Sequence, residues 1–214
     1  MLYWVKTRWF IRKIFPNYIW HIPNNQKMVY LTFDDGPTPE VTEWVLDLLK
    51  EHNIKATFFC IGNNIEEHPD IFNKVIENGH AIGNHTFNHL NGWTTNNDVY
   101  RENTESAENA ITNRHPEFTN TKLFRPPYGK LKKVQSRYIR NKGYKVIMWD
   151  VLSADFDTAA VTPEKCLKNV TDNTEEGSII IFHDSVKASP NLKYALPKTI
   201  EHLKEKGFRF DKIN

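Results

Sequence analysis

The hydrophobic positions of this chain fall into two patterns, short apolar runs and stretches with helical spacing. The apolar runs are rich in β-branched and aromatic residues, which is typical of buried strands. We predict seven strands, at residues 28–33, 56–61, 80–83, 122–124, 144–149, 178–182 and 208–210. Between the strands, apolar residues recur at intervals of three and four, which predicts helices with one buried face. We place these helices at residues 39–51, 69–77, 98–113, 132–142, from 162 onward, and 192–206.

Regular alternation of strand and helix predicts a parallel sheet with helices outside it. Polar and ionisable residues follow five of the predicted strands, always at the carboxyl end. They are Asp34, Asp35, His85, His89, Arg125, Tyr128, Asp150, Asp155, His183 and Asp184. An open doubly wound sheet would gather such residues near one switch point, whereas a (β/α) barrel builds its active site from many strand ends. We therefore expect an α/β fold, a distorted (β/α) barrel of about seven parallel strands with outer helices.

Two adjacent acids, Asp34 and Asp35, end the first predicted strand, and Gly36-Pro37 then turns the chain away. Carboxylates at the end of an apolar strand are tolerated when they are paired or bound to a metal. Neighbouring side chains on a strand face opposite ways, so the two acids can have different roles. One could hold a metal while the other abstracts a proton. The alternative is an acidic turn without chemistry.

His85 and His89 are four residues apart, which on a helical turn places them on one face. With an aspartate from the first strand they would form two imidazoles and a carboxylate with room for water. This ligand set favours one divalent metal, zinc first, with cobalt, nickel or iron as alternatives, and it does not suit calcium. A structural or incidental role is the alternative for the histidine pair.

The composition describes an ordinary globular protein of 214 residues, with 39% hydrophobic and 25% charged residues. A net charge of +2 gives no reason to expect nucleic acid as a partner. The charge is uneven, because residues 1–33 contain five basic residues and no acidic one. Cys60 and Cys166 are too few and too distant for a disulfide framework, so cysteine usage does not fix the compartment.

We divide the chain into an N-terminal extension, residues 1–27, and a catalytic domain, residues 28–214. The extension combines its basic residues with bulky aromatic ones, six of them between residues 4 and 20. These aromatics could pack on the domain, or residues 1–22 could lie on an anionic membrane surface. The extension lacks the apolar run of a signal peptide or a membrane span, so a cytoplasmic or membrane-peripheral location is the default expectation.

Four sequence motifs carry a resemblance to a known family. They are Thr32-Phe33-Asp34-Asp35-Gly36-Pro37, His85-Thr86-x-x-His89, Arg125-Pro126-Pro127-Tyr128-Gly129 and the strand that ends in His183. In this order, and after separate strands, they resemble the polysaccharide deacetylases, also called the NodB-homology domain or carbohydrate esterase family four. The resemblance covers roughly residues 28–210.

The resemblance implies a metal-dependent hydrolase acting on C–N bonds other than peptide bonds, which removes acetyl groups from N-acetylated sugars. The substrate would be peptidoglycan or a chitin-like oligosaccharide, and we expect a monomer. The metal ligands would be Asp35, His85 and His89. Asp34 would be the general base held by Arg125, the backbone N–H of Tyr128 would bind the oxyanion, and His183 would be the general acid. Substrate would contact Pro127, Trp149, Leu152 and Phe156.

One stretch departs from the family pattern. The family has Asp-x-x-Asp-Trp after strand five, and here Asp155-Phe156 resembles its end, which leaves Leu152 where the first acid would stand. Asp150 shares a strand face with Leu152 by alternation, so it could substitute, or it could be a solvated strand-end residue. The partner that tunes His183 or Arg125 is therefore open. A non-catalytic carbohydrate-binding homologue and an amidohydrolase of small cyclic amides remain as alternative functions.

Overall fold

A parallel sheet lies at the centre of the structure, which is a computed structural model that describes residues 4–214. The first three residues of the predicted extension lie outside the described residues. Seven strands follow one another in the order β5-β4-β3-β2-β1-β7-β6, and β8 pairs with the start of β1. The strands are β1 (Met28–Asp34), β2 (Thr57–Cys60), β3 (Ala81–Asn84), β4 (Leu123–Phe124), β5 (Lys145–Val146), β6 (Val151–Leu152), β7 (Ile179–His183) and β8 (Arg209–Phe210).

β1 is the central strand, and it is buried because it carries apolar side chains on both faces. It pairs in parallel with β2 on one side and β7 on the other. The Phe33 ring therefore stacks beside Phe58 and Phe182, at centroid distances of 5.0 and 6.3 Å. The same run of apolar residues ends at Asp34, so packing of the strand carries this acid to the carboxyl edge of the sheet.

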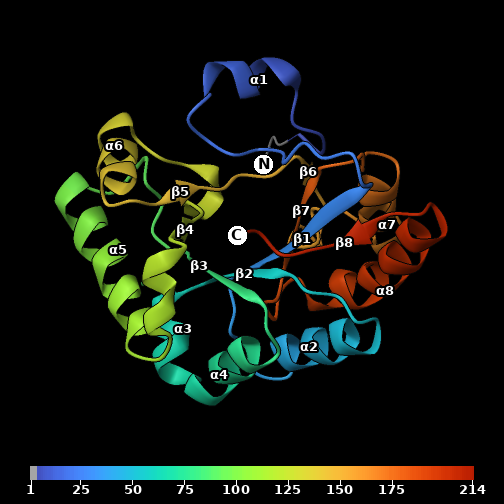
Figure 1. Cartoon of the computed structure of the whole chain (residues 1–214), viewed down its shortest axis with the longest axis horizontal. Helices are drawn as coiled ribbons and strands as arrows, with labels where there is room; N and C mark the ends of the chain where they lie inside the picture. Colours follow the sequence, from blue (N-terminus) through green and yellow to red (C-terminus); the bar gives the residue numbers. More distant parts are fainter. Residues whose placement is uncertain (1–3) are drawn as a thin grey trace.

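The sheet curls into a half-barrel with helices around it (Figure 1), which confirms the predicted distorted (β/α) barrel. α2 buries the apolar face that its sequence spacing predicts, through Val41, Val45 and Leu49. The helices are α1 (Trp9–Ile14), α2 (Val41–Glu51), α3 (Gly62–Glu67), α4 (Pro69–Glu77), α5 (Asn97–Thr112), α6 (Lys133–Asn141), α7 (Pro163–Thr171) and α8 (Ser189–Glu205), with short 3₁₀ segments at Pro116–Asn120 and Pro127–Gly129.

Helix starts show how local chemistry sets the boundaries. α7 begins as predicted, because the Thr162 hydroxyl accepts the Lys165 N–H at 3.2 Å and proline occupies the first position. The helix predicted from residue 39 begins two residues later. Glu40 has a φ of 63°, in the left-handed region, so the right-handed helix cannot pass through it. α1 and α3 are additions that the spacing did not predict.

The predicted alternation fails at one place, between β5 and β6. Of the strand expected at residues 144–149 only β5 forms, and the unpredicted β6 follows it with no helix between the two. The N-terminal segment fills the gap, as the dark blue trace beside β5 and β6 in Figure 1 shows. Met148 N–H donates to the Ile19 carbonyl at 2.7 Å, and Leu152 N–H donates to the Val5 carbonyl at 2.8 Å. Residues outside the predicted domain thus continue the sheet.

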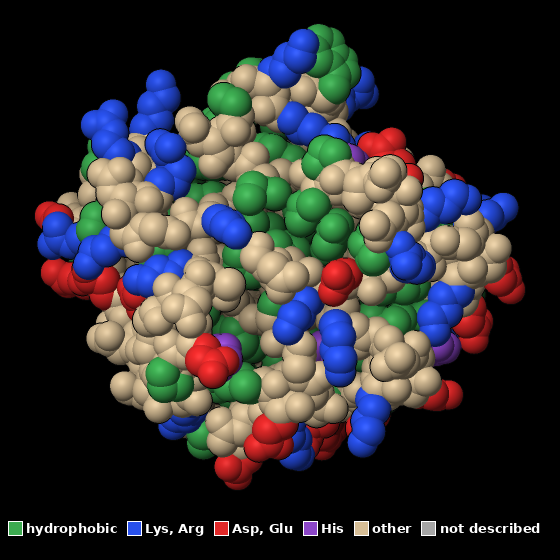
Figure 2. All heavy atoms as spheres, viewed as in Figure 1, with side chains coloured by type: hydrophobic (Ala, Val, Ile, Leu, Met, Phe, Trp, Pro, Cys, Tyr) green, Lys and Arg blue, Asp and Glu red, His purple; other side chains and the backbone are tan. Residues whose placement is uncertain are grey.

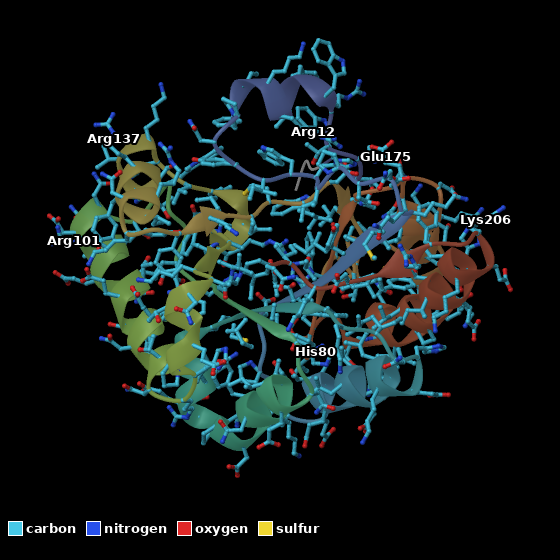
Figure 3. All side chains as sticks on the ribbon, in the orientation of Figure 1. Arg12, His80, Arg101, Arg137, Glu175 and Lys206 are labelled. Carbon is cyan, nitrogen blue, oxygen red and sulfur yellow. The ribbon has the colours of Figure 1, made fainter. Side chains whose placement is uncertain are left out.

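A buried acid, Asp150, anchors this N-terminal segment to the barrel. Lys6 Nζ lies 2.7 Å from Asp150 Oδ2, the Arg12 guanidinium contacts Oδ1, and Ser178 donates its hydroxyl at 2.6 Å. Figure 3 shows Arg12 and Glu175 at this junction, and their side chains lie 3.7 Å apart. Two cations and a hydroxyl therefore compensate for the burial of the Asp150 charge.

α1 stands on this anchored segment and exposes apolar side chains to solvent. None of its residues is buried, and Trp9 and Ile14 are 68% and 62% exposed. Lys13 Nζ lies 4.8 Å from the Trp9 ring, so basic and aromatic groups alternate on its surface. Figure 2 shows this mixture of apolar and basic side chains at the top of the view. Of the helices within residues 4–214, none has both the length and the apolar content to cross a bilayer.

Candidate active site

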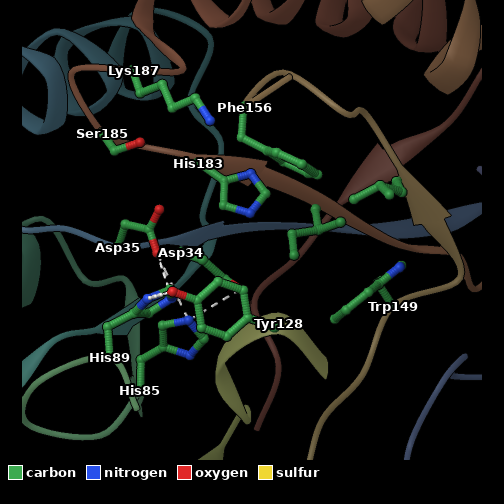
Figure 4. A pocket seen from close by; sticks show the side chains of 12 residues that line it. Asp34, Asp35, His85, His89, Tyr128, Trp149, Phe156, His183, Ser185 and Lys187 are labelled. Atoms are coloured by element: carbon green, nitrogen blue, oxygen red, sulfur yellow. Dashed lines mark hydrogen bonds and ion pairs between the residues drawn. The ribbon is translucent and has the colours of Figure 1, made fainter. Parts of the chain in front are cut away.

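A cavity of about 430 Å³ opens at the carboxyl ends of the strands (Figure 4). Nine of the eleven residues predicted for the site line it. The exceptions are Arg125, which lies beneath Asp34, and Pro127, which is buried in its 3₁₀ segment. The lining consists of Asp34, Asp35, His85, His89, Tyr128, Trp149, Leu152, Phe156, Ile181, His183, Ser185 and Lys187.

Asp35, His85 and His89 converge on one point of the cavity. Asp35 Oδ1 lies 3.3 Å from His89 Nε2 and 3.8 Å from His85 Nε2. This oxygen is buried and, within the described residues, has no hydrogen-bond partner. A buried carboxylate oxygen without a partner is costly, and a cation between the three side chains would satisfy it. The donor set of two imidazoles and a carboxylate therefore fits a divalent transition metal.

Neighbouring groups orient both imidazoles toward this point. His85 Nδ1 lies 2.7 Å from the Arg125 carbonyl, so Nδ1–H donates there and Nε2 is left to face Asp35. His89 Nδ1 lies 3.2 Å from the Tyr128 hydroxyl. Burial lowers the pKa of both histidines, most strongly that of His85. Both rings are therefore neutral near pH 7, the form that binds metal.

The prediction that His85 and His89 share a helical face is wrong. Residues 85–89 form a loop, in which Thr86 and His89 have φ values of 63° and 53°. The loop is held by the Thr86 hydroxyl, which accepts the Leu90 N–H at 3.0 Å, and by Asn103, which accepts the Phe87 N–H at 2.8 Å. The loop turns the two rings toward each other without helical periodicity.

Asp34 faces a buried arginine beneath the cavity. Arg125 Nη1 donates to Asp34 Oδ1 at 2.7 Å, and the same atom donates to the Thr32 hydroxyl at 2.7 Å. The guanidinium also donates to the Met148 carbonyl at 3.0 Å and lies 4.1 Å from the Phe59 ring. These contacts fix the carboxylate in one orientation. Its second oxygen lies 3.7 Å from His85 Nε2, on the side of the candidate metal ligands.

His183 lies on the other side of the cavity and is paired with Asp155. His183 Nδ1 is 2.7 Å from Asp155 Oδ1, and His183 N–H donates to Oδ2 at 2.7 Å. Burial by itself would lower the pKa of His183, but the Asp155 carboxylate raises it to about 9. The Phe156 ring meets the imidazole edge-on at 5.0 Å. Asp155 is therefore the acid that orients His183. Although Leu152 stands where the family has its first acid, His183 still has an acidic partner.

Asp150 does not replace the missing acid. Its N–H donates to the Ile179 carbonyl in β7, whereas Leu152 N–H points the opposite way, to Val5. In a regular strand these two N–H groups would point the same way, so the alternation is broken between them. Leu152 faces the cavity, while Asp150 faces Lys6 and its neighbours. The predicted shared face is wrong for this reason.

Several residues near the cavity had no predicted role. Asp184 is fully buried and accepts the Gly36 N–H at 3.0 Å and the Thr42 hydroxyl, and burial raises its pKa to about 8. A side chain at position 36 would collide with it, because a Cβ there would lie 2.0 Å from Asp184 Oδ2. Ser185 and Lys187 line the cavity from the next residues. A serine and a lysine after a strand resemble any surface loop, so no sequence signal marks them.

Comparisons with known proteins give relatives of this chain and of its fold. The family model described as polysaccharide deacetylase matches residues 21–147. A peptidoglycan-N-acetylglucosamine deacetylase of Bacillus cereus is 38% identical over 195 residues, which cover 88% of this chain and 67% of that protein. The solved structure of the Bc1960 peptidoglycan N-acetylglucosamine deacetylase has a TM-score of 0.87 at 34% identity and covers 97% of this chain and 95% of that one. A pseudoenzyme of carbohydrate esterase family four from Bacillus anthracis has a TM-score of 0.80 at 27% identity, over 91% of this chain and 66% of that one.

Proposed function

This chain belongs to the polysaccharide deacetylase family, and we propose that it removes acetyl groups from N-acetylated sugars, in peptidoglycan or in a chitin-like oligosaccharide. One observation carries the proposal. The cavity places an acid held by arginine, Asp34, beside the candidate metal ligands, and a histidine held by an acid, His183, across from His85 and His89. Hydrolysis of an amide needs a base for the attacking water and an acid for the leaving amine.

Asp35, His85 and His89 would hold one divalent metal, and zinc is the first candidate, with cobalt, nickel or iron as alternatives. A metal bound there would polarise the acetyl carbonyl and lower the pKa of water. The fit rests on the partnerless Asp35 oxygen and on the two neutral imidazoles described above.

Asp34 would act as the general base. Arg125 occupies its Oδ1, which leaves Oδ2 on the side of His85 and His89 to take the proton from the attacking water. The carbonyl oxygen then gains negative charge, and the backbone N–H of Tyr128 would donate a hydrogen bond to it. Tyr128 has a φ of 60° in its 3₁₀ segment, a left-handed conformation that is uncommon for residues other than glycine and clusters at functional sites.

His183 would act as the general acid. Asp155 occupies Nδ1, so Nε2 is the nitrogen that can donate a proton to the leaving amine. The raised pKa means that the imidazole is protonated at neutral pH, as this role requires. Trp149, Leu152 and Phe156 form an apolar wall that would receive the acetyl methyl group and exclude water. Pro127 would shape the neighbouring turn, since it is buried.

Acetate release tests the proposal. Metal-stripped protein, with and without added zinc or cobalt, would be incubated with peptidoglycan fragments and N-acetylglucosamine oligomers. We expect release that depends on metal and is lost, by about 10³-fold or more, in His85→Ala. A control variant, Lys50→Met, changes an exposed lysine in the last turn of α2 and should leave release unchanged.

Two outcomes would contradict the proposal. Tight glycan binding without turnover by metal-loaded wild type would favour the non-catalytic carbohydrate-binding homologue. Turnover of cyclic ureides without turnover of sugars would favour the amidohydrolase of small cyclic amides. The Asp155–His183 pair favours the enzyme over the binding protein, because a cleft that only binds sugar does not need an oriented, protonated imidazole.

We further propose that the protein works as a monomer and that residues 1–22 contact an anionic membrane surface. The cavity is built from one chain. Among the described residues, Trp4, Trp9, Ile14 and Phe15 are exposed around α1, and aromatic and basic groups together are typical of interfacial segments. We expect sedimentation with vesicles containing anionic lipid and about fivefold less in Trp9→Ala. Equal sedimentation of both proteins, or none of wild type, would contradict membrane contact.

A further inference from the structure

The loop that follows β7 forms one wall of the cavity, and its backbone is fixed at both ends. Asp184 is buried against Gly36 and Thr42. Ser189 N–H donates to the Ser185 carbonyl at 3.0 Å, where α8 begins. Between these fixed points the side chains of Ser185 and Lys187 turn to the cavity, and Lys187 is exposed. The loop therefore presents a hydroxyl and an ammonium group at a defined place.

Lys187 differs from the other charged groups of the cavity because it has no partner. Asp34 is paired with Arg125, and His183 with Asp155. Asp35 faces the two imidazoles. No hydrogen bond or ion pair joins Lys187 Nζ to any residue in the described part of the chain. Figure 4 shows this nitrogen above His183 and beside Phe156, which also line the cavity.

The position of Lys187 relative to His183 defines what it can reach. In the proposed reaction, the nitrogen that leaves with the sugar lies at His183 Nε2, so the sugar ring lies on that side of the cavity. Substituents of this ring, or of the next sugar, then pass the wall that carries Ser185 and Lys187. An ammonium group with no protein partner there is complementary to an anionic substituent.

Building on the proposed function, we propose that Lys187 selects glycans that carry a carboxylate beside the N-acetylated sugar. Peptidoglycan carries such groups in its stem peptides, and in its lactyl ethers where no stem peptide is attached, whereas a chitin-like chain is neutral. Lys187 Nζ would pair with the carboxylate, and the Ser185 hydroxyl would donate a second hydrogen bond. The lysine is thus a specificity residue and takes no part in the chemical step.

The test compares two substrates that differ only in charge. One is a soluble peptidoglycan glycan fragment, and the other is the same fragment with its carboxylates converted to methyl amides. The ratio of kcat/KM for the two substrates is measured with zinc-loaded wild type, Lys187→Met and Lys187→Glu. We expect the ratio to fall about fivefold in Lys187→Met, through KM, as for a partly exposed ion pair. The fall should be larger in Lys187→Glu and smaller at high salt.

Lys50→Met is the matched control. Lys50 is also exposed, and no hydrogen bond or ion pair joins it to the described residues, but it lies in the last turn of α2, at the end of the helix away from the cavity. Its removal should leave the ratio unchanged. An unchanged ratio in both Lys187 variants, or an equal loss with both substrates, would overturn the proposal and leave the deacetylase function standing.

Binding measurements distinguish a failure of the deacetylase function from a failure of the role proposed for Lys187. The affinity of the Asp34→Asn protein for both fragments is measured by calorimetry, with and without Lys187→Met. If wild type shows no turnover and Lys187→Met still weakens only the carboxylate fragment, the deacetylase function fails and the Lys187 assignment stands. If Lys187→Met leaves both affinities unchanged, the assignment fails whatever the activity.

Discussion

Asp150 and Asp155 lie five residues apart, and both are fully buried and paired with a cation, yet they belong to different regions of the molecule. Asp155 holds His183 at the cavity. Asp150 holds Lys6 and Arg12 and fastens the N-terminal segment into the gap between β5 and β6. A buried carboxylate needs a positive partner in either place. The comparison shows that the partner, and not the acid, decides whether the pair serves chemistry or assembly.

The largest expected effect comes from breaking the pair at the cavity. Asp155→Asn keeps the shape of the side chain but removes the charge that holds His183 protonated. We expect kcat to fall about 100-fold, as for loss of a general acid, while metal binding and folding remain. Acetate release and thermal unfolding of the zinc-loaded protein measure this. Asp150→Asn is the control, and equal activity losses in the two variants would remove the distinction between the regions.

Breaking the pair at the N-terminal junction should affect stability and not turnover. Asp150→Ala removes the buried anion that Lys6 and Arg12 share, leaves them the exposed carboxylate of Glu175, and leaves Ser178 without its acceptor. Both cations can regain water, so we expect a loss of about 3 kcal/mol in the free energy of unfolding, at the lower end of the range for buried pairs. Urea unfolding measures this loss. Folded protein should keep its kcat, and a fall in kcat comparable with that of Asp155→Asn would show that Asp150 acts on the site.

The pH dependence of kcat tests the role of the Asp155–His183 pair directly. The pKa of His183 is raised to about 9, so the general acid is protonated below that pH and kcat should fall as pH rises through it. The same raised pKa stabilises the folded state fully below about pH 6.5, and this contribution is lost as pH rises toward 9. In Asp155→Asn burial dominates, and the alkaline limb should move to lower pH by more than one unit. A kcat profile with the same alkaline limb in both proteins would rule out His183 as the titrating acid.

The smallest effect is expected from removing Lys6, because other groups at the N-terminal junction still contact Asp150. In Lys6→Met, Arg12 and Ser178 still hold Asp150. We expect a loss of about 1 kcal/mol, the scale of a partly exposed ion pair. Urea unfolding with the double variant Lys6→Met/Asp150→Ala gives the coupling between the two side chains. A coupling near zero would mean that Arg12 alone compensates for the Asp150 charge.

The pattern of residues along the chain specifies the barrel and the edge at which the site lies. Short apolar runs mark buried strands, and helical spacing reports which face of a helix is buried; both signals are local. Parallel strands bring their carboxyl ends to one edge, so the positions of Asp34, His85, Arg125 and His183 directly after strands suffice to bring them together. The ligand chemistry of Asp35, His85 and His89 also follows from residue type, and their metal-binding role stays a prediction.

Only the tertiary structure decided which groups meet. Residues 85–89 form a loop held by Asn103, a contact that no spacing within the motif encodes. Asp150 and Asp155 look alike in sequence, and the insertion of residues 4–22 beside β6 gives them different partners. Nothing in the sequence distinguishes Lys187 from other lysines. The fold places it at the cavity, where it has no partner among the described residues. Periodicity records burial within one element, whereas the partner of a charge depends on which distant segments pack against it.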